Sequence, residues 1–161
     1  MRYLVREKFF RLGEDNDISD ESGNPVFRVD GKALSLRDLM VVQDLQGIEV
    51  ARVHRKLASM LPQYEIDLAG QETAVLHRKL SMLKPVWSLS VPGQEEMQLE
   101  GNLLQHEFTV QRGGAVVATV SRAWVSLSAT YGVDVAPGEN DLLVLGVVLA
   151  LEADEQREHK G

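Results

Sequence analysis

The stretch "LLVLGVVLAL", from Leu142 to Leu151, has no polar side chain over ten residues and lies near the end of the chain. A helix that is apolar on every side has to be buried, because a surface helix keeps a polar face. Ten helical residues extend over about 15 Å, half of the roughly 30 Å of hydrocarbon in a membrane. The run also contains none of the Lys or Arg residues that an interfacial helix carries. We therefore expect a helix in the core of the protein.

The residues just before this run predict where the helix begins. Pro137 and Gly138 end the preceding strand, because neither residue belongs in the interior of a strand. Asn140 or Asp141 can accept hydrogen bonds from the free N–H groups of the first turn and so cap the helix. We predict a central helix over about residues 140–156.

The chain that precedes the helix contains an internal repeat. "GIEVARVHRKL" begins at Gly47, "GQETAVLHRKL" begins at Gly70, and the more distant copy "GAVVATVSRAW" begins at Gly114. Weaker copies begin at Gly23 and Gly93, so that the repeat glycines are 21–24 residues apart. Each copy has room for two short strands and a turn, and glycine suits such turns because hairpins need positive φ.

Within each repeat, apolar and polar residues alternate. The stretches "QYEID", "VWSLS" and "TYGVD" place apolar side chains on one parity: Tyr64, Ile66, Trp87, Leu89, Tyr131 and Val133. A period of two is typical of strands that bury one face. Five repeats and an opening pair around "YLVREKFF" and "DNDIS" predict about twelve strands joined as antiparallel hairpins.

A closed barrel explains why a chain of strands ends in a buried helix. A stacked solenoid is the alternative for repeats of this length. We prefer the barrel because both strands of each repeat are amphipathic and no leucine–asparagine ladder is present. About eight strands can fill a barrel with their own side chains, so twelve require a plug. The helix is the candidate, and the small residues Ala51, Ala74 and Ala118, at one repeat position, leave it space.

Length and composition agree with one mainly β domain over residues 1–161, with the barrel over about residues 1–137. The chain has no cysteine, which excludes disulfides, thiolate catalysis and Cys-ligated metal centres. Its net charge of −7 argues against nucleic acid as a partner. The charged residues in "MRYLVREKFF" leave no signal peptide, and we expect no transmembrane segment. We expect a cytoplasmic protein, with a peripheral location on a membrane as the alternative.

Several stretches in this order resemble the LURP-one-related family, and through it the Tubby C-terminal domain and the phospholipid scramblases. They are "ISDESGNPVFRVDGKALS", "DLQGIEVARVHRKL", "LPQYEI", "GNLLQHEFTV", "VATVSRAW", "ATYGVDV" and "GVVLALE". The resemblance implies a twelve-stranded barrel around a hydrophobic C-terminal helix. Tubby domains bind phosphoinositides through basic surface residues, but no residue here matches that site. Scramblases carry a membrane helix and an acidic calcium segment. We expect neither in this chain, so scramblase activity is not expected.

Two basic clusters at equivalent strand ends are the candidate binding site. They comprise His54, Arg55, Lys56, His77, Arg78 and Lys79. These residues would suit an anion or a phospholipid headgroup, and Arg52 and Lys84 could join them. The alternative is that solvated strand ends repeat because the fold repeats. Arg122 occupies the position of Arg55 and Arg78 in the copy that begins at Gly114, but its neighbours in the sequence are neutral.

The remaining polar clusters predict no catalytic or metal site. The segment "EDNDISDES" begins like a calcium loop, but Asp20 stands where glycine is needed and Val26 where a bidentate Glu is needed. A polar turn is the preferred interpretation. His54, His77, His106 and His159 form no short metal motif, and His106 has the parity of an inward core residue. The pair Glu95–Glu96 lies in a predicted turn. We expect no metal, no cofactor and no enzymatic activity.

Two function classes follow. The first is a non-enzymatic binding or scaffolding module for an unknown protein or small ligand. The second is a peripheral module that binds anionic phospholipid headgroups in the manner of Tubby domains. An enzyme has little support, because no nucleophile elbow, P-loop or dinucleotide loop is present.

Overall fold

The computed structural model describes residues 1–6, 16–30, 39–56, 59–80, 86–126 and 130–160, with side chains up to Arg157. These residues form a mainly β domain of strands followed by one helix. In order they are β1 (Arg2–Arg6), β2 (Asn16–Asp20), β3 (Pro25–Asp30), β4 (Leu39–Gln43), β5 (Glu49–Arg55), β6 (Gln63–Leu68), β7 (Ala74–Lys79), β8 (Val86–Ser90), β9 (Met97–Asn102), β10 (Glu107–Arg112), β11 (Ala115–Ser121), β12 (Thr130–Val135) and α2 (Asp141–Lys160).

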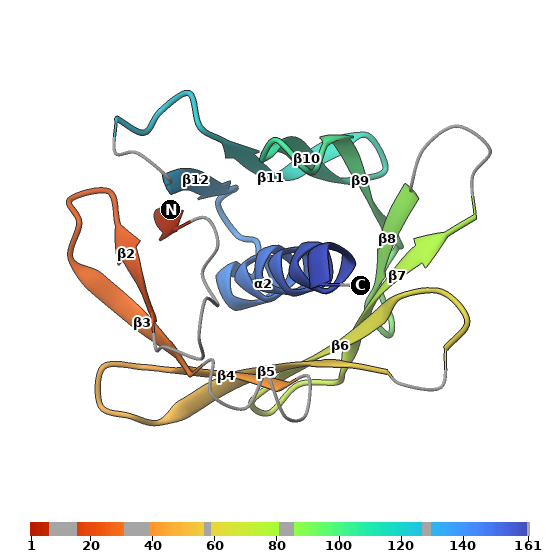
Figure 1. Ribbon diagram of the computed structural model, residues 1–161, viewed down its shortest axis with the longest axis horizontal. Helices are drawn as coiled ribbons and strands as arrows, with labels where there is room; N and C mark the ends of the chain where they lie inside the picture. Colours follow the sequence, from red (N-terminus) through yellow and green to blue (C-terminus); the bar gives the residue numbers. More distant parts are fainter. Residues whose placement is uncertain (7–15, 31–38, 57–58, 81–85, 127–129, 161) are drawn as a thin grey trace.

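The strands form a closed antiparallel barrel around α2 (Figure 1). Each strand pairs with the next along the chain, and β1 pairs with β12 to close the sheet, with Tyr3 opposite Val133. The predicted twelve-stranded barrel of hairpins is therefore confirmed. The solenoid alternative is wrong, because the first and last strands would then be far apart.

The alternating apolar residues face the interior of the barrel, as the sequence predicts. Tyr64 and Ile66 on β6 are almost completely buried, and Leu89 on β8 and Val133 on β12 are equally inaccessible. Burying one such aliphatic side chain contributes roughly 1.5–3 kcal/mol. Strand parity therefore determines which side chains surround the helix.

The repeat glycines lie in hairpin turns. Gly47, for example, has a φ of 83° and nothing near the position that a Cβ would take. In the same turn the Asp44 carboxylate accepts hydrogen bonds from the N–H groups of Gln46 and Ile48, each at 2.9 Å. These hydrogen bonds stabilise the turn, because they satisfy backbone N–H groups that the turn leaves without a partner in the sheet.

The helix begins where the sequence predicts. The Leu143 N–H donates to Asn140 Oδ1 at 3.2 Å, so Asn140 is the residue that caps it. It ends at Lys160 rather than near residue 156. Its last turns contain Glu, Ala, Gln and Arg, which favour helix without needing burial.

The apolar run of α2 occupies the centre of the barrel. Val147, Leu149 and Ala150 have no exposed surface. A Cβ on Gly146 would lie only 2.7 Å from Ile66 Cγ2, so the helix makes its closest approach to β6 there. Within the described part of the chain, no helix is both long enough and apolar enough to cross a membrane.

Candidate functional site

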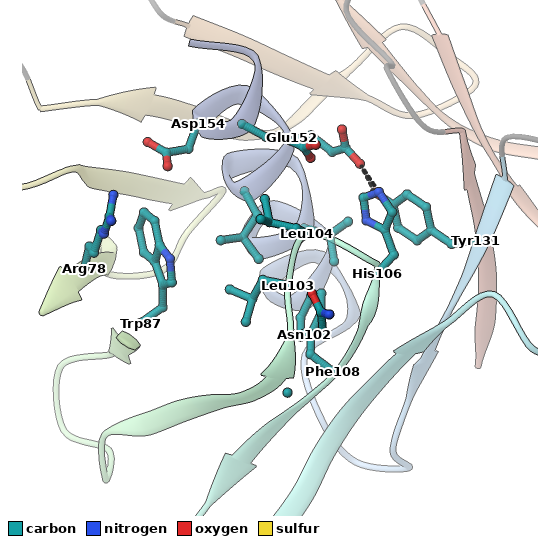
Figure 2. A pocket seen from close by; sticks show the side chains of 14 residues that line it. Arg78, Trp87, Asn102, Leu103, Leu104, His106, Phe108, Tyr131, Glu152 and Asp154 are labelled. Carbon is teal, nitrogen blue, oxygen red and sulfur yellow. Dashed lines mark hydrogen bonds and ion pairs between the residues drawn. The ribbon is translucent and has the colours of Figure 1, made fainter. Parts of the chain in front are cut away.

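A cavity of about 400 Å³ opens at the barrel mouth where the C-terminal half of α2 lies. We call it the mouth cavity. Its lining comes from β7–β10, β12, α2 and the turn between β9 and β10 (Figure 2). The lining residues are Arg78, Trp87, Gly101, Asn102, Leu103, Leu104, His106, Phe108, Tyr131, Val148, Leu151, Glu152, Asp154 and Glu155.

Most of the wall is apolar. Trp87 from β8 and Phe108 from β10 are each 5% exposed, and Val148 lies on the helix face that meets them. Leu103 and Leu104 come from the turn after β9. A hollow with such walls favours an apolar group over water, because water finds few partners there.

His106 lies at the polar side of the mouth cavity. It has a φ of 54°, in the left-handed region that non-glycine residues rarely adopt, and its N–H donates to Leu103 O at 3.2 Å. Its ring stacks on Tyr131, with ring centroids 4.1 Å apart and planes 7° apart. The predicted inward orientation of His106 is confirmed, since the residue is 7% exposed.

Glu152 meets both of these aromatic rings. The Tyr131 hydroxyl donates to Glu152 Oε1 at 3.0 Å, and His106 Nε2 lies 3.4 Å from the same oxygen (Figure 2). Glu152 is only 4% exposed. Glu155 follows three residues later on the same helix face. One donor atom each from His106, Glu152 and Glu155 lie within 4.8 Å of one another.

Asp154 is a second buried carboxylate at this mouth. It is 7% exposed and accepts a hydrogen bond from the Tyr64 hydroxyl at 3.0 Å. Burial, followed by the charge of Asp154, raises the pKa of Tyr64 far above that of a free phenol. Arg78 and Trp87 lie on the same side of the view as Asp154 (Figure 2). The mouth cavity therefore combines apolar walls with several buried or half-buried charges.

The structure separates the six basic residues predicted as a binding site. Arg55 and Arg78 have the parity of the buried residues on β5 and β7, so they lie on the inner side of the barrel rim. Arg78 lines the mouth cavity, and the charge of Arg55 acts on the hydroxyl of Tyr64. β6 lies between the two strands, so the clusters are not adjacent along the sheet.

The other four basic residues have the outward parity, and three of them contact nearby side chains. His54 Nε2 lies 3.0 Å from Asp67 Oδ2 and 3.4 Å from Glu65 Oε2. His77 Nε2 lies 3.3 Å from Ser90 Oγ. Lys79 Nζ lies 2.6 Å from Glu96 Oε1, an ion pair that lowers the pKa of Glu96. Lys56 is exposed. The outward residues thus do not form one continuous basic patch.

The other basic residues that the sequence considers are Arg52 and Lys84, which could join the patch, and Arg122, which also repeats. Arg52 pairs with Glu49 on the outer surface of β5. Arg122 is exposed just beyond the end of β11, where its N–H donates to Glu107. Lys84 lies outside the described residues, and so does the side chain of His159.

The described part of the acidic segment near the start of the chain forms β2 and the hairpin turn that follows it. The Asp20 carboxylate accepts hydrogen bonds from the N–H groups of Ser22 and Asn24 at 2.9 and 3.0 Å. Asp17 pairs with Arg28 on the neighbouring strand at 3.4 Å. Glu14 and Asp15, which began the calcium interpretation, lie outside the described residues. Asp20 therefore caps a hairpin turn, as Asp44 does in the next repeat.

Sequence reasoning missed the acidic end of α2. Glu152 and Glu155 follow directly after the apolar run, and their spacing places them on one helix face. That spacing was the available signal. It pointed to a charged site only once the helix was known to be inside a barrel, because the same residues on a surface helix would simply be solvated.

A second cavity, of about 450 Å³, lies at the opposite mouth around the start of α2. Its rim is polar, with Arg112 Nη1 2.8 Å from Glu139 Oε1. We favour the mouth cavity at the other end because it holds the buried titratable groups His106 and Glu152.

Comparison with known proteins agrees with this architecture. The chain is 28% identical over 149 residues to the uncharacterized protein YxjI of Bacillus subtilis (strain 168), covering 92% of this chain and 90% of YxjI. The X-ray structure of the Arabidopsis thaliana protein AT5G01750 has the same fold, with a TM-score of 0.62 and 16% identity. That match covers 97% of this chain and 92% of the plant protein.

The sequence pattern of the family described as LURP-one-related matches residues 1–152. This range includes every strand of the barrel and the apolar run of α2. It confirms the resemblance found in the sequence: the chain belongs to the LURP-one-related family.

Proposed function

We propose that this protein is a non-enzymatic binding module whose ligand is a small molecule held in the mouth cavity. The observation that carries the proposal is a hollow of about 400 Å³ beside α2, with aromatic and aliphatic walls and a few buried polar groups. Small-molecule sites are typically pockets of about 300–1,000 Å³ with this composition. The mouth of a β-barrel is also a common place for them.

The lining indicates the chemistry of the ligand. An apolar body would lie against Trp87, Phe108 and Leu151. A polar group would lie toward His106 and Glu152, which are held in place by contacts with Tyr131. The ligand is therefore amphipathic, with its polar group directed to the His106 side of the mouth cavity.

The composition of the lining supports binding rather than catalysis. Among the described residues that line the mouth cavity there is no Ser, Thr, Cys or Lys. These residue types supply most enzymatic nucleophiles. The histidine and carboxylates that are present can orient a polar group without forming a covalent bond to it.

A neutral naphthylamine dye tests the proposal, with Trp87 as the reporter. The chain has two tryptophans, and Trp124→Phe leaves only the one that lines the mouth cavity. We expect saturable quenching of Trp87 fluorescence by the dye. Val148→Phe in the same background should weaken dye binding by about tenfold or more, a loss of about 1.4 kcal/mol, because the larger ring occupies the mouth cavity.

Val116→Phe is the matched control, because Val116 is 49% exposed on the outer side of β11. It should bind the dye as the parent does. Circular dichroism melts show that each variant is folded before it is titrated. Absence of saturable quenching, or equal affinity in the Val148→Phe and Val116→Phe variants, would contradict a ligand site in the mouth cavity.

Anionic phospholipid headgroups remain the second candidate, because Arg55 and Arg78 both lie at one rim of the barrel. The acidic Asp154 and Glu155 at the same mouth oppose this function. If the ligand is a phospholipid headgroup, the protein would lie at a membrane surface. If the ligand is a small molecule in the mouth cavity, we expect a cytoplasmic protein. Phosphatidylserine vesicles at low salt distinguish the two, since screening is then weakest. Binding that is lost in the variant Arg55→Ala plus Arg78→Ala would favour phospholipid, and no binding would remove it.

A further inference from the structure

We infer that His106, Glu152 and Glu155 form a binding site for one divalent transition-metal ion at the polar side of the mouth cavity. The sequence predicts no metal site, because none of the four histidines belongs to a short-spaced metal motif. The barrel brings together His106, from the turn just before β10, and two glutamates from the C-terminal half of α2. The ion site shares His106 and Glu152 with the polar side of the proposed ligand site, but the metal alone tests it, so it does not rest on the small-ligand function.

The first argument is the distance between the donor atoms. His106 Nε2 and Glu152 Oε1 are 3.4 Å apart, and the donor atoms of all three residues lie within 4.8 Å. Metal–ligand bonds of about 2.0–2.2 Å place neighbouring donors about 3–3.5 Å apart, so the first two already have the spacing of a coordination sphere. Glu155 is only half-buried, and its long side chain can adjust to complete the site.

The second argument is the burial of the donors. His106 and Glu152 are only 7% and 4% exposed. Buried carboxylates are costly unless cations or hydrogen-bond donors compensate them. Buried charged groups in proteins are paired or coordinate metal ions, and the close pair of His106 and Glu152 can do both.

The third argument is that two of the donors are already oriented. Tyr131 donates a hydrogen bond to Glu152 Oε1 at 3.0 Å and stacks against the ring of His106. Hydrogen bonds from a second layer of residues fix ligand orientation in known metal sites and raise their affinity. Tyr131 is fully buried, so it holds both side chains in one arrangement.

The donor set determines the class of ion. One imidazole nitrogen and two carboxylates, with no thiolate in the chain, suit Zn²⁺ or Co²⁺. Ca²⁺ and Mg²⁺ prefer oxygen donors alone, so they fit less well. Three protein ligands leave the remaining positions open toward the mouth cavity, where water or a ligand group can bind.

The test is a titration of the untagged, full-length chain, freed of metal with a chelator. CoCl₂ is followed by visible absorption and ZnCl₂ by calorimetry. We expect one equivalent of either ion to bind, and Zn²⁺ to raise the melting temperature by mass action. Glu155→Gln and His106→Asn should each weaken binding by about tenfold or more, the range seen when metal sites are disturbed. Asn is chosen because it tolerates the positive φ at this position.

Two matched controls address adventitious binding. Glu100→Gln removes an exposed carboxylate from β9, and His77→Asn removes an imidazole from the outer side of β7. Both should bind Zn²⁺ like the parent. No saturable binding, or equal losses in site and control variants, would overturn the inference. Dye binding by the metal-free chain, measured in parallel, keeps this outcome separate from the small-ligand proposal.

Discussion

Gly146 shows how one residue positions the helix. It is the single glycine in the apolar run, and the space for its missing side chain is taken by Ile66 on β6. Glycine within a helix usually costs about 1 kcal/mol relative to alanine. Here the close packing of α2 against the barrel wall, which a residue without a side chain permits, offsets that cost.

Replacement of Gly146 by alanine therefore has two opposing effects. The helix gains up to about 1 kcal/mol of propensity, and overpacking against Ile66 costs about 1–3 kcal/mol. We expect Gly146→Ala to lower the free energy of unfolding by roughly 1–2 kcal/mol, measured by urea denaturation. The loss should be smaller in an Ile66→Val background. Unchanged or increased stability of Gly146→Ala would show that the close contact is not limiting.

Tyr3 is a buried phenol that connects the first strand to the start of the helix. Its hydroxyl donates to the Asp141 carboxylate. Burial, then that hydrogen bond and the charge of Asp141, raise the pKa of Tyr3 well above its ordinary value near 10. The folded state therefore holds the phenolic proton more tightly than the unfolded state does.

This shift predicts how stability changes at alkaline pH. A raised pKa contributes stability that is fully present below about pH 10 and is lost as the pH rises, because the unfolded phenol ionises first. The free energy of unfolding should fall by up to about 1.4 kcal/mol per pH unit for this group. Tyr3→Phe should make the decline shallower in urea unfolding between about pH 9 and pH 11. Identical slopes in the two chains would mean that Tyr3 titrates normally.

The helix is the element whose burial the sequence predicts most directly. Leu145, near the middle of the apolar run, is 1% exposed, and its neighbours on α2 are equally buried. After Asp141 at the start of α2, the next charged residue is Glu152, at the barrel mouth. The order of residues along α2 therefore follows the change from barrel interior to rim.

A charge inside the barrel should be incompatible with folding. Leu145→Asp places a carboxylate in the apolar part of the core, at a cost of several kcal/mol, comparable with a net stability of roughly 5–15 kcal/mol. We expect the variant to be insoluble or to melt far below the parent. Leu45→Asp is the control, since Leu45 is 62% exposed in a turn and should tolerate the change. Similar melts of Leu145→Asp and the parent would argue against a buried helix.

The whole molecule depends on closure around the helix. The N-terminal amine of Met1 donates to Val135 O at 2.9 Å, so the first residue contacts the end of the last strand. β1 and β12 pair along their whole length. Among the residues that the structure describes, closure leaves no strand at a free sheet edge, and α2 lies in the enclosed space.

Removal of the helix should therefore be worse than any single substitution. A chain without Gly138–Gly161 would enclose an apolar space that water does not wet well. We expect this truncated chain to be insoluble or unfolded, and the complete chain to be soluble without detergent. Soluble expression and a circular dichroism melt measure both. A truncated chain that melts like the parent would show that the barrel does not need its plug.

The sequence by itself determined the strands, their turns, the buried helix and the barrel, because all of these follow from local periodicity. Alternation placed Tyr64 and Tyr131 inside, and the repeat glycines marked the turns. Only the tertiary structure decided the site. His106 and Glu152 are far apart in the chain and meet because closure brings β10 and β12 around the end of α2. Arg78 likewise lines the mouth cavity because the sheet is closed. In a closed barrel, alternate residues of each strand face the interior and the others face outward.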